Sequence, residues 1–531
     1  MKWVAGVCVG VAVAVGVGMV FAVGGIRGEW WARAALAAGA AAGFLAWRGV
    51  VEDRPARFGF WDVAVLGALV LAAFRAFFWL YYEDGDQLKV LSPHNLGDLS
   101  LHIGLVRYFA SGVAFWPPSP ILAGEPLTYP PGADFFNALL AGAGMEVRPG
   151  FILCGFLGAL TGGWALWRYG GAFSVAALIF GGGLAGFEIF RTGAFVEYGG
   201  EDVWKNAFLT MVVTQRGFLY ALPVGVLLLW GWWGEFFSGG RRVPFWVQVV
   251  LYATMPLFQL HTFLFLSAAL ACAVVIFPRG WRHPVGLILA SLPAGTACVL
   301  AVTGFFRAKG ALRFEPGWAA PGGTGEFFLE FGVVLVLGVA ALAGAWKSGD
   351  PAARWMGVTC AGAALVGFLT PLNDWAWDNT KILIWAWLGA SPLIWKYAVG
   401  RVAVPARVAL CGLLFFSGAV GLAAGLDRRH GYALADLGEL AEWESLLADV
   451  PAGAVIACES TYNHPAFLLG RPVVCGYEGH LSSHGLDYRE KLEALRRVVA
   501  LQPGWRELAE SIGATHVAPT GNGAVLLPVR E

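Results

Sequence analysis

Charge is scarce in this sequence. Only 14% of the 531 residues are Asp, Glu, Lys or Arg, whereas 58% are hydrophobic. A soluble protein of this length needs far more charge to cover its surface, so the composition argues against that class. The 36 basic and 36 acidic residues balance, and no net positive charge attracts nucleic acid as a partner. A lipid environment explains the composition, because side chains that face lipid must also be apolar.

Several familiar sequence signals are missing as well. The eight cysteines lie mostly alone in apolar runs, and no CxxC or Cys/His spacing predicts a structural metal site. The sequence shows no Gly-rich nucleotide-binding loop, internal repeat or low-complexity linker. Residues 1–23 lack a clear cleavage site after them, so we interpret them as a first span and not as a signal peptide.

Apolar runs long enough to cross a bilayer recur through residues 1–426. The run at 243–277 is too long for one span. Because Pro256, Gln259 and His261 lie near its middle, we expect two short helices that meet at a polar turn. The sequence then predicts an α-helical polytopic protein with about 13 transmembrane helices. The other runs are at 3–23, 34–47, 60–80, 149–167, 172–190, 217–234, 285–304, 328–346, 355–371, 380–398 and 405–425.

Basic residues predict the orientation, because short loops rich in Lys and Arg stay in the cytoplasm. With 13 spans and a cytoplasmic N-terminus, the basic loops fall on one side, and the loop with Arg27 and Arg33 is the one mild exception. The protein is therefore predicted to lie in the inner or plasma membrane, among membrane lipids. The segments expected outside are 81–147, 191–216, 305–327 and the C-terminal tail.

The tail, residues 427–531, changes in composition and predicts a small soluble α/β domain outside the membrane. Expected strands are 454–458, 472–475, 516–518 and 524–528, and expected helices are 463–469, 488–501 and 505–512. Cys458 and Cys475 end two of these strands, so they could form a disulfide; two free thiols are the alternative. The tail shows no catalytic constellation, and we expect it to cover an outer cavity or to select an acceptor.

The first outer loop, 81–147, carries the strongest candidates for chemistry. Asp98 and His102 are four residues apart on a stretch with helical apolar spacing, so they share one face. A carboxylate near a histidine can accept a proton from a hydroxyl, or bind a divalent ion such as Mg²⁺ or Mn²⁺. Asp84 and Asp86 follow directly on the third span. The plainer interpretation of the pair is a helix-capping Asp and a solvated His.

Other polar groups at outer span ends are candidate substrate contacts. Lys381 begins a span on the side where a cation is disfavoured, and binding of a lipid phosphate would explain it. The alternative is a Lys that extends to the interface and pairs with Asp378. Arg216 is likewise an outer-side cation at the start of a span, and binding of a lipid phosphate would explain it too. Tyr129, His261, Asp378 and Asn379 are further candidates, and each could instead be an anchoring or structural residue.

The order of these motifs resembles that of the GT-C class of membrane glycosyltransferases, and more closely the bacterial dolichyl-phosphate-mannose mannosyltransferase-like group. The motifs are GDLSLH at 97–102, FWPP at 115–118, AGEPLTY at 123–129, WDNTK at 377–381, and the tail segments at 470–472, 476–479 and 483–488. The sequence departs from many members of the group at its start, where two spans precede the one that leads into the acidic loop.

The resemblance implies transfer of a sugar from a polyprenyl-phosphate-linked donor to a glycan, lipid or protein acceptor on the outer face. It makes Asp98 the catalytic acidic residue, as base or metal ligand, with His102 as its helper. Asp84 and Asp86 are the reserve candidates, because the family also shows acidic pairs just after the preceding span. Lys381 and Arg216 match clamps for the lipid phosphate. Such a transfer needs a base opposite the leaving phosphate and cations that stabilise its charge.

Two other functions stay open at this point. A transporter or flippase of a lipid-linked saccharide needs charges buried within its spans, and often paired repeats. Glu188 is one candidate for such a charge, because it lies near the end of an expected span. A non-catalytic membrane scaffold, whose tail binds a partner, is the third possibility.

Overall fold

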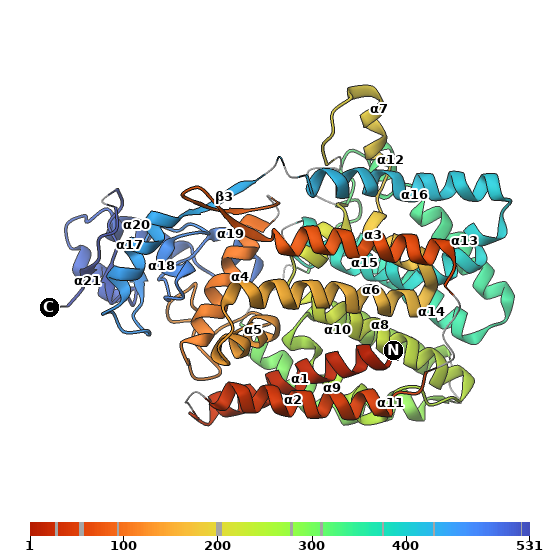
Figure 1. Ribbon diagram of the computed structural model, residues 1–531, viewed down its shortest axis with the longest axis horizontal. Coiled ribbons are helices and arrows are strands. Elements are labelled where there is room, and N and C mark those ends of the chain that lie inside the picture. The colour runs from red at the N-terminus through yellow and green to blue at the C-terminus, as the bar shows by residue number, and fades with distance from the viewer. Residues whose placement is uncertain are drawn as a thin grey trace.

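Long helices run side by side through most of the molecule, and a smaller region of mixed structure covers one end of them (Figure 1). The computed structural model describes residues 1–26, 30–52, 58–92, 95–197, 204–276, 280–307, 312–373, 376–427, 429, 431–521 and 523–530. Arg27 and parts of the basic loops, at 53–57 and 277–279, lie outside the described residues.

Among the described residues, eight helices are long and apolar enough to cross a membrane. They are α1 (Lys2–Val23), α3 (Phe60–Phe78), α6 (Val147–Phe180), α8 (Phe218–Ser238), α11 (Arg282–Val302), α14 (Pro351–Leu369), α15 (Ala376–Tyr397) and α16 (Val404–Gly425). The pair α12 (Thr324–Phe331) and α13 (Val334–Ser348), bent by 75°, makes nine if it forms one span. The chain is thus a multi-pass membrane protein, although fewer helices qualify as spans than the 13 that the sequence predicts. The helix α2 (Trp30–Gly49) packs against α1.

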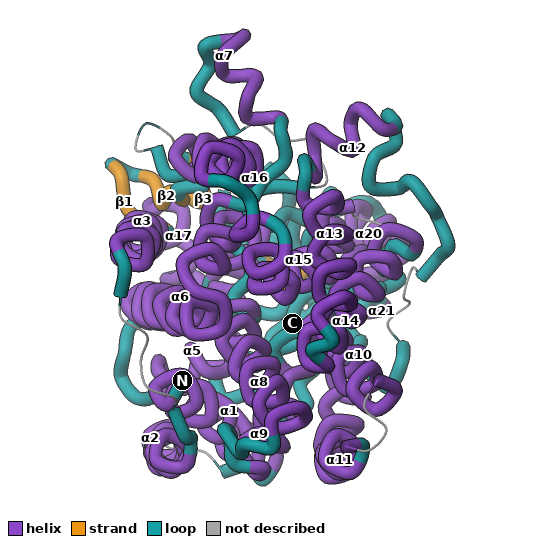
Figure 2. The backbone as a smooth tube through the Cα atoms, turned by 90° about the vertical axis from the view of Figure 1, so that its right-hand side faces the viewer, coloured by secondary structure: helices purple, strands orange, loops and turns teal. Residues whose placement is uncertain are grey.

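The predicted pair of spans at 149–167 and 172–190 forms a different structure. The first falls in α6 and the second begins there, but the helix is broken at Gly170 and Gly171 and ends at Phe180. The glycines that follow allow close packing: a Cβ on Gly182 would lie 2.8 Å from the backbone nitrogen of Gly418 in α16. The chain then forms η1 (Ala185–Glu188) and α7 (Ile189–Thr192), which projects beyond α16 (Figure 2).

The long apolar run at 243–277 divides as expected. It forms α9 (Phe245–Thr254), the short η3 (Met255–Leu257) and α10 (Leu260–Ile276). Pro256 lies within η3, because proline fits the start of a helical turn but interrupts a continuous helix. The turn places Gln259 and His261 at the start of α10, where they face the cavity described below.

The segment after α3 forms the base of the mixed region. It contains β1 (Tyr81–Asp84), β2 (Gln87–Val90), α4 (Asn95–Ala110) and α5 (Gly132–Gly142). After α16, β3 (Tyr432–Asp436) pairs with β2 in an antiparallel arrangement, and the sheet order is β1-β2-β3. This sheet therefore joins the first loop to the tail, although they are more than 300 residues apart in sequence.

The tail contains six of the seven expected elements in shorter form, and three that were not expected: β3, α17 and α19. Its second sheet has the order β4-β5-β6. The strands are β4 (Ile456–Ala457), β5 (His516–Val517) and β6 (Leu527–Pro528). The helices are α17 (Leu437–Leu447), α18 (Pro465–Leu468), α19 (Glu478–Ser483), α20 (Arg489–Val499) and α21 (Trp505–Ser511). The 472–475 strand is present only as isolated bridges. Cys458 and Cys475 are buried free thiols.

The tail packs directly on the first loop. The Ala123 N–H donates to the Val474 carbonyl at 3.0 Å, and the Gly476 N–H donates to the Ile121 carbonyl at 2.8 Å. On α4, a Cβ at Gly104 would lie 2.6 Å from the Phe467 ring, so the tail approaches the helix backbone at this point. The first loop and the tail thus form one continuous packed region at the end of the helix bundle.

Candidate functional site

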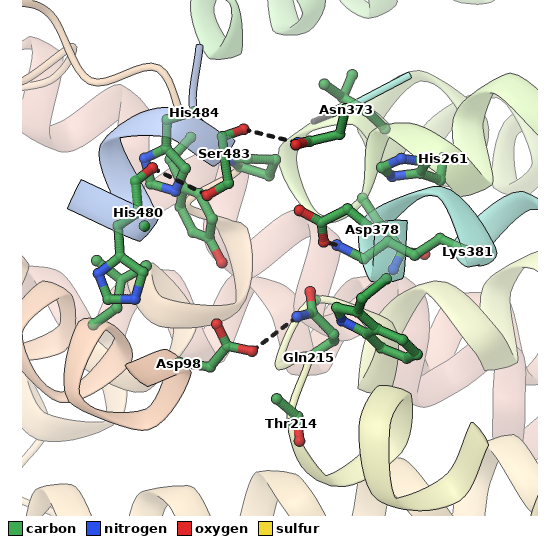
Figure 3. A pocket seen from close by; sticks show the side chains of 18 of the residues that line it. Asp98, Thr214, Gln215, His261, Asn373, Asp378, Lys381, His480, Ser483 and His484 are labelled. Atoms are coloured by element: carbon green, nitrogen blue, oxygen red, sulfur yellow. Dashed lines mark hydrogen bonds and ion pairs between the residues drawn. The ribbon is translucent and has the colours of Figure 1, made fainter. Parts of the chain in front are cut away.

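A cavity of about 670 Å³ lies between the helix ends and the mixed region. This volume is typical of sites for small molecules, which span roughly 300–1,000 Å³. Its walls come from the first turn of α4, the loop before α5, the segment that joins η2 (Phe208–Val213) to α8, the turn between α9 and α10, the start of α15, and α19 of the tail. Figure 3 shows the side chains that face it.

Asp98 lies in the first turn of α4 and faces this cavity. Its Oδ2 accepts a hydrogen bond of 3.0 Å from the Nε2 of Gln215 (Figure 3). Burial raises the pKa of Asp98, and the nearby His102 and Lys381 and the Gln215 hydrogen bond only partly oppose this. A carboxylate with a raised pKa is a stronger base than an ordinary Asp, which suits it to accept a proton from a hydroxyl.

Lys381 and Asp378 face the cavity from the first turns of α15. The Lys381 ammonium donates to Asp378 Oδ1 at 2.6 Å, and their side chains are 11% and 16% exposed. The pairing expected in the alternative interpretation is therefore present, and the pair lines the cavity. An ammonium has three N–H donors, so Lys381 keeps the capacity to bind an anion as well.

His102 is close to Asp98 in sequence but does not line the cavity. Its Nδ1 lies 2.9 Å from Asp134 Oδ1 and 3.0 Å from Oδ2, and both side chains are buried. Asp134 belongs to α5 and was not among the predicted site residues. The pair joins α4 to α5 and thereby supports the turn that carries Asp98.

The described residues show no ligand set for the divalent ion that Asp98 and His102 could bind. No group of three or more His, Cys, Asp or Glu there is arranged to hold a metal ion. Asp98 has the amide of Gln215 as its hydrogen-bond partner, and His102 is engaged by Asp134. Because His102 does not line the cavity with Asp98, the two do not form the oxygen-rich site that Mg²⁺ or Mn²⁺ prefers.

Arg216 is buried beside the cavity and does not line it. Its Nη2 donates to the Phe151 carbonyl at 3.1 Å, and its guanidinium lies 4.5 Å from the centre of the Phe151 ring. The preceding residue, Gln215, faces the cavity instead. The sequence has no signal that separates these two neighbours, because the direction of each side chain depends on how the η2 segment packs.

Three further predicted residues lie outside the cavity lining. Asp84 and Asp86 sit at the β1–β2 hairpin, where Asp84 is 61% exposed and pairs with Lys89 at 2.7 Å. Asn379 is buried, and its Oδ1 accepts from the backbone N–H of Leu372 at 2.6 Å. Asn379 thus shapes the loop before α15.

Tyr129 and His261 do line the cavity. The centre of the Tyr129 ring lies 4.8 Å from that of His484, with 30° between the ring planes. Burial raises the pKa of Tyr129 well above its usual value, so its phenol stays protonated and can donate a hydrogen bond. Together with Asp98, Asp378 and Lys381, five of the ten predicted site residues therefore meet in one cavity.

The helix α19 adds side chains that the sequence analysis did not assign to the site. His480, Ser483 and His484 line the cavity (Figure 3). Burial lowers the pKa of His484 to about 4 and that of His480 to about 3, so both imidazoles are neutral at neutral pH. The GT-C resemblance includes the segment at 483–488, but no spacing rule connects it to residues of α4 or α15.

No protein-family model and no curated protein sequence matches the chain. Among solved structures, it is similar to the archaeal oligosaccharyltransferase AglB from Archaeoglobus fulgidus in complex with an inhibitory peptide and a dolichol-phosphate. That match has a TM-score of 0.43 and 11% identity, and it covers 86% of this chain and 69% of the other. The apo form of the Archaeoglobus fulgidus oligosaccharyltransferase matches with a TM-score of 0.45, at the same identity and coverage. A likeness this remote does not show what reaction this chain catalyses.

Proposed function

We propose that the cavity is the active site of a GT-C type glycosyltransferase that takes a sugar from a polyprenyl-phosphate-linked donor. The main support is the placement of Asp98 and Lys381 on different walls of one cavity at the ends of the membrane helices (Figure 3). Such a site offers a base and a cation to a substrate whose lipid chain stays in the bilayer. The basic loops of the sequence suggest that the site faces the extracytoplasmic side.

Asp98 is the base in this proposal. The oxygen of an acceptor hydroxyl attacks the anomeric carbon of the donor sugar, and the bond from that carbon to the phosphate oxygen breaks. The hydroxyl proton passes to the Asp98 carboxylate, and the bonding electrons leave with the polyprenyl phosphate. The Gln215 amide fixes the direction of the carboxylate by its hydrogen bond of 3.0 Å.

Lys381 stabilises the negative charge that develops on the leaving phosphate. It can do so without moving far, because the 2.6 Å contact with Asp378 holds its ammonium at the cavity wall. His261 and Tyr129 line the same cavity and offer hydrogen bonds to the sugar or the phosphate. Fixed donors of this kind act most strongly where water is excluded.

The test compares the purified full chain with Asp98→Asn on a labelled polyprenyl-phosphate hexose in the presence of saccharide, lipid and peptide acceptors. The matched control is Asp84→Asn, because Asp84 is an exposed aspartate of the same loop outside the cavity. We expect transfer by the wild type and the control, and a loss of about 10²–10⁴-fold in Asp98→Asn, which is the usual contribution of a general base.

If Asp98→Asn transfers the sugar at the wild-type rate, Asp98 is not the base of the reaction. Absence of donor consumption by the wild type would favour a transporter or a scaffold. Measuring movement of the same lipid-linked sugar across a vesicle bilayer then separates these two functions.

A further inference from the structure

The two sides of the cavity differ in charge. The sides formed by α4 and α15 carry Asp98, Asp378 and Lys381. The tail side, formed by residues 477–485, presents neutral groups, since the imidazoles of His480 and His484 are uncharged at neutral pH. Glu478, the acidic residue of α19, does not line the cavity and pairs with Arg496 at 3.3 Å. A ligand on the tail side therefore meets hydrogen-bonding groups without a formal charge.

Aromatic faces accompany these neutral groups. The centres of the Tyr129 and His484 rings lie 4.8 Å apart with 30° between the ring planes, and Trp377 and Tyr477 also line the cavity. A sugar ring has an apolar C–H face and a rim of hydroxyls. An aromatic face beside hydroxyl and imidazole groups matches both features.

A peptide would find few backbone partners on the tail side. Peptides that bind in extended form add to a free sheet edge. The edge next to α19, at 473–476, is already paired with the chain's own segment at 120–123. Within α19 the backbone bonds are internal, as in the His484 N–H that donates to the His480 carbonyl at 2.9 Å.

The tail side is also held next to the charged sides. The side-chain amide of Asn373 donates to the Ser483 carbonyl at 3.3 Å, and this bond connects α19 to the loop before α15 (Figure 3). His484 is close enough to Asp378 and Lys381 to interact with them electrostatically. A molecule bound on α19 would thus present its hydroxyls to the part of the cavity where a donor phosphate would bind.

We infer that the tail side of the cavity is the acceptor site, and that the acceptor is a neutral saccharide seated against Tyr129 and His484. The role of this saccharide as an acceptor rests on the proposed glycosyl transfer, but its binding can be tested without any turnover.

The experiment measures binding to the detergent-solubilised full chain by calorimetry, without donor. The probes are neutral di- and trisaccharides of glucose, galactose and mannose, and uncharged tripeptides with a central Asn, Ser or Thr. We expect at least one saccharide to bind, and His484→Ala and Tyr129→Leu each to weaken it by about tenfold or more. The control is His516→Ala, since His516 lies in β5 away from the cavity and bonds to Thr515.

Three results would overturn the inference: no saccharide binds, peptides bind in place of saccharides, or binding is unchanged in both His484→Ala and Tyr129→Leu. Donor consumption, measured in parallel with Asp98→Asn, keeps the two proposals apart. If donor consumption depends on Asp98 but no saccharide binds, the proposed transferase activity stands and the saccharide acceptor is rejected. If a saccharide binds but no donor is consumed, the saccharide site stands and the proposed transferase activity is rejected.

Discussion

The side-chain amide of Gln215 donates a hydrogen bond of 3.0 Å to the carboxylate of Asp98. This contact joins the segment after η2 to the first turn of α4, two parts of the chain 117 residues apart. Asp98 thereby has one oxygen bonded, and Figure 3 shows its carboxylate directed towards Gln215 at the cavity. A base held in this way needs little reorganisation before it accepts a proton.

The first prediction concerns pH. The Gln215 hydrogen bond favours the ionised carboxylate, so Gln215→Ala raises the pKa of Asp98 further above its usual value. Because the base acts only when ionised, the acidic limb of kcat/KM should move to higher pH, by about one unit for the loss of a hydrogen bond to a charged group. The pH profile of transfer measures this. Gln502→Ala, at an exposed tail position, is the control, and an unshifted limb in Gln215→Ala contradicts the prediction.

The second prediction concerns stability. The folded-state pKa of Asp98 is raised, so its favourable contribution exists below the unfolded pKa and is lost as pH rises through the folded pKa. At neutral pH the ionised carboxylate therefore costs stability. Asp98→Asn should have a higher Tm than the wild type at neutral pH, and the difference should shrink as the pH falls. A lower Tm at neutral pH would show that the carboxylate stabilises the fold.

The third prediction separates donor binding from folding at Lys381. Removing Lys381 alone leaves the mostly buried carboxylate of Asp378 without its ion-pair partner. Breaking a buried pair in this way lowers the free energy of unfolding by about 3–5 kcal/mol. Lys381→Met should therefore lower the Tm, and Lys381→Met with Asp378→Asn should recover much of it. Both variants should raise KM for the donor, because neither has the cation. If the double variant has the donor KM of the wild type, Lys381 does not bind the phosphate.

The fourth prediction assigns His102 a supporting role. His102→Ala and Asp134→Ala should each lower the Tm, because each leaves a buried polar partner unsatisfied. In the double variant the loss should be less than the sum of the two, with a coupling of about 0.5–3 kcal/mol. His102→Gln should retain transfer by the folded fraction, unlike Asp98→Asn. Loss of transfer in His102→Gln without loss of Tm would instead make His102 a catalytic residue.

The fifth prediction tests how the tail is held. A side chain at Gly104 would collide with Phe467, so Gly104→Leu should loosen the tail on α4. Trypsin should then cleave within 427–531 faster than in the wild type. The matched control is Gly67→Leu in α3, where a Cβ meets no atom within 4 Å. Equal cleavage rates in the two variants would mean that this contact does not hold the tail.

Some features of the site are local in sequence and could be predicted from it. Asp98 lies at the start of an apolar-periodic stretch, and Pro256 interrupts a run too long for one span, so both positions follow from short-range rules. The pairing of Lys381 with Asp378 is also local, because residues three apart on a helix are neighbours. The helix expected at 172–190 ends early, at Phe180, and the glycines that follow pack closely against distant segments, among them α16.

The sequence alone determined that this chain belongs in a membrane, because hydropathy over about 20 residues is a property of the local run. Only the tertiary structure decided which polar groups meet at the cavity. Gln215 faces Asp98 while its neighbour Arg216 turns to Phe151, and His484 reaches Tyr129 from more than 350 residues away. These choices depend on the packing of segments far apart in the chain, and no local pattern of residues encodes them.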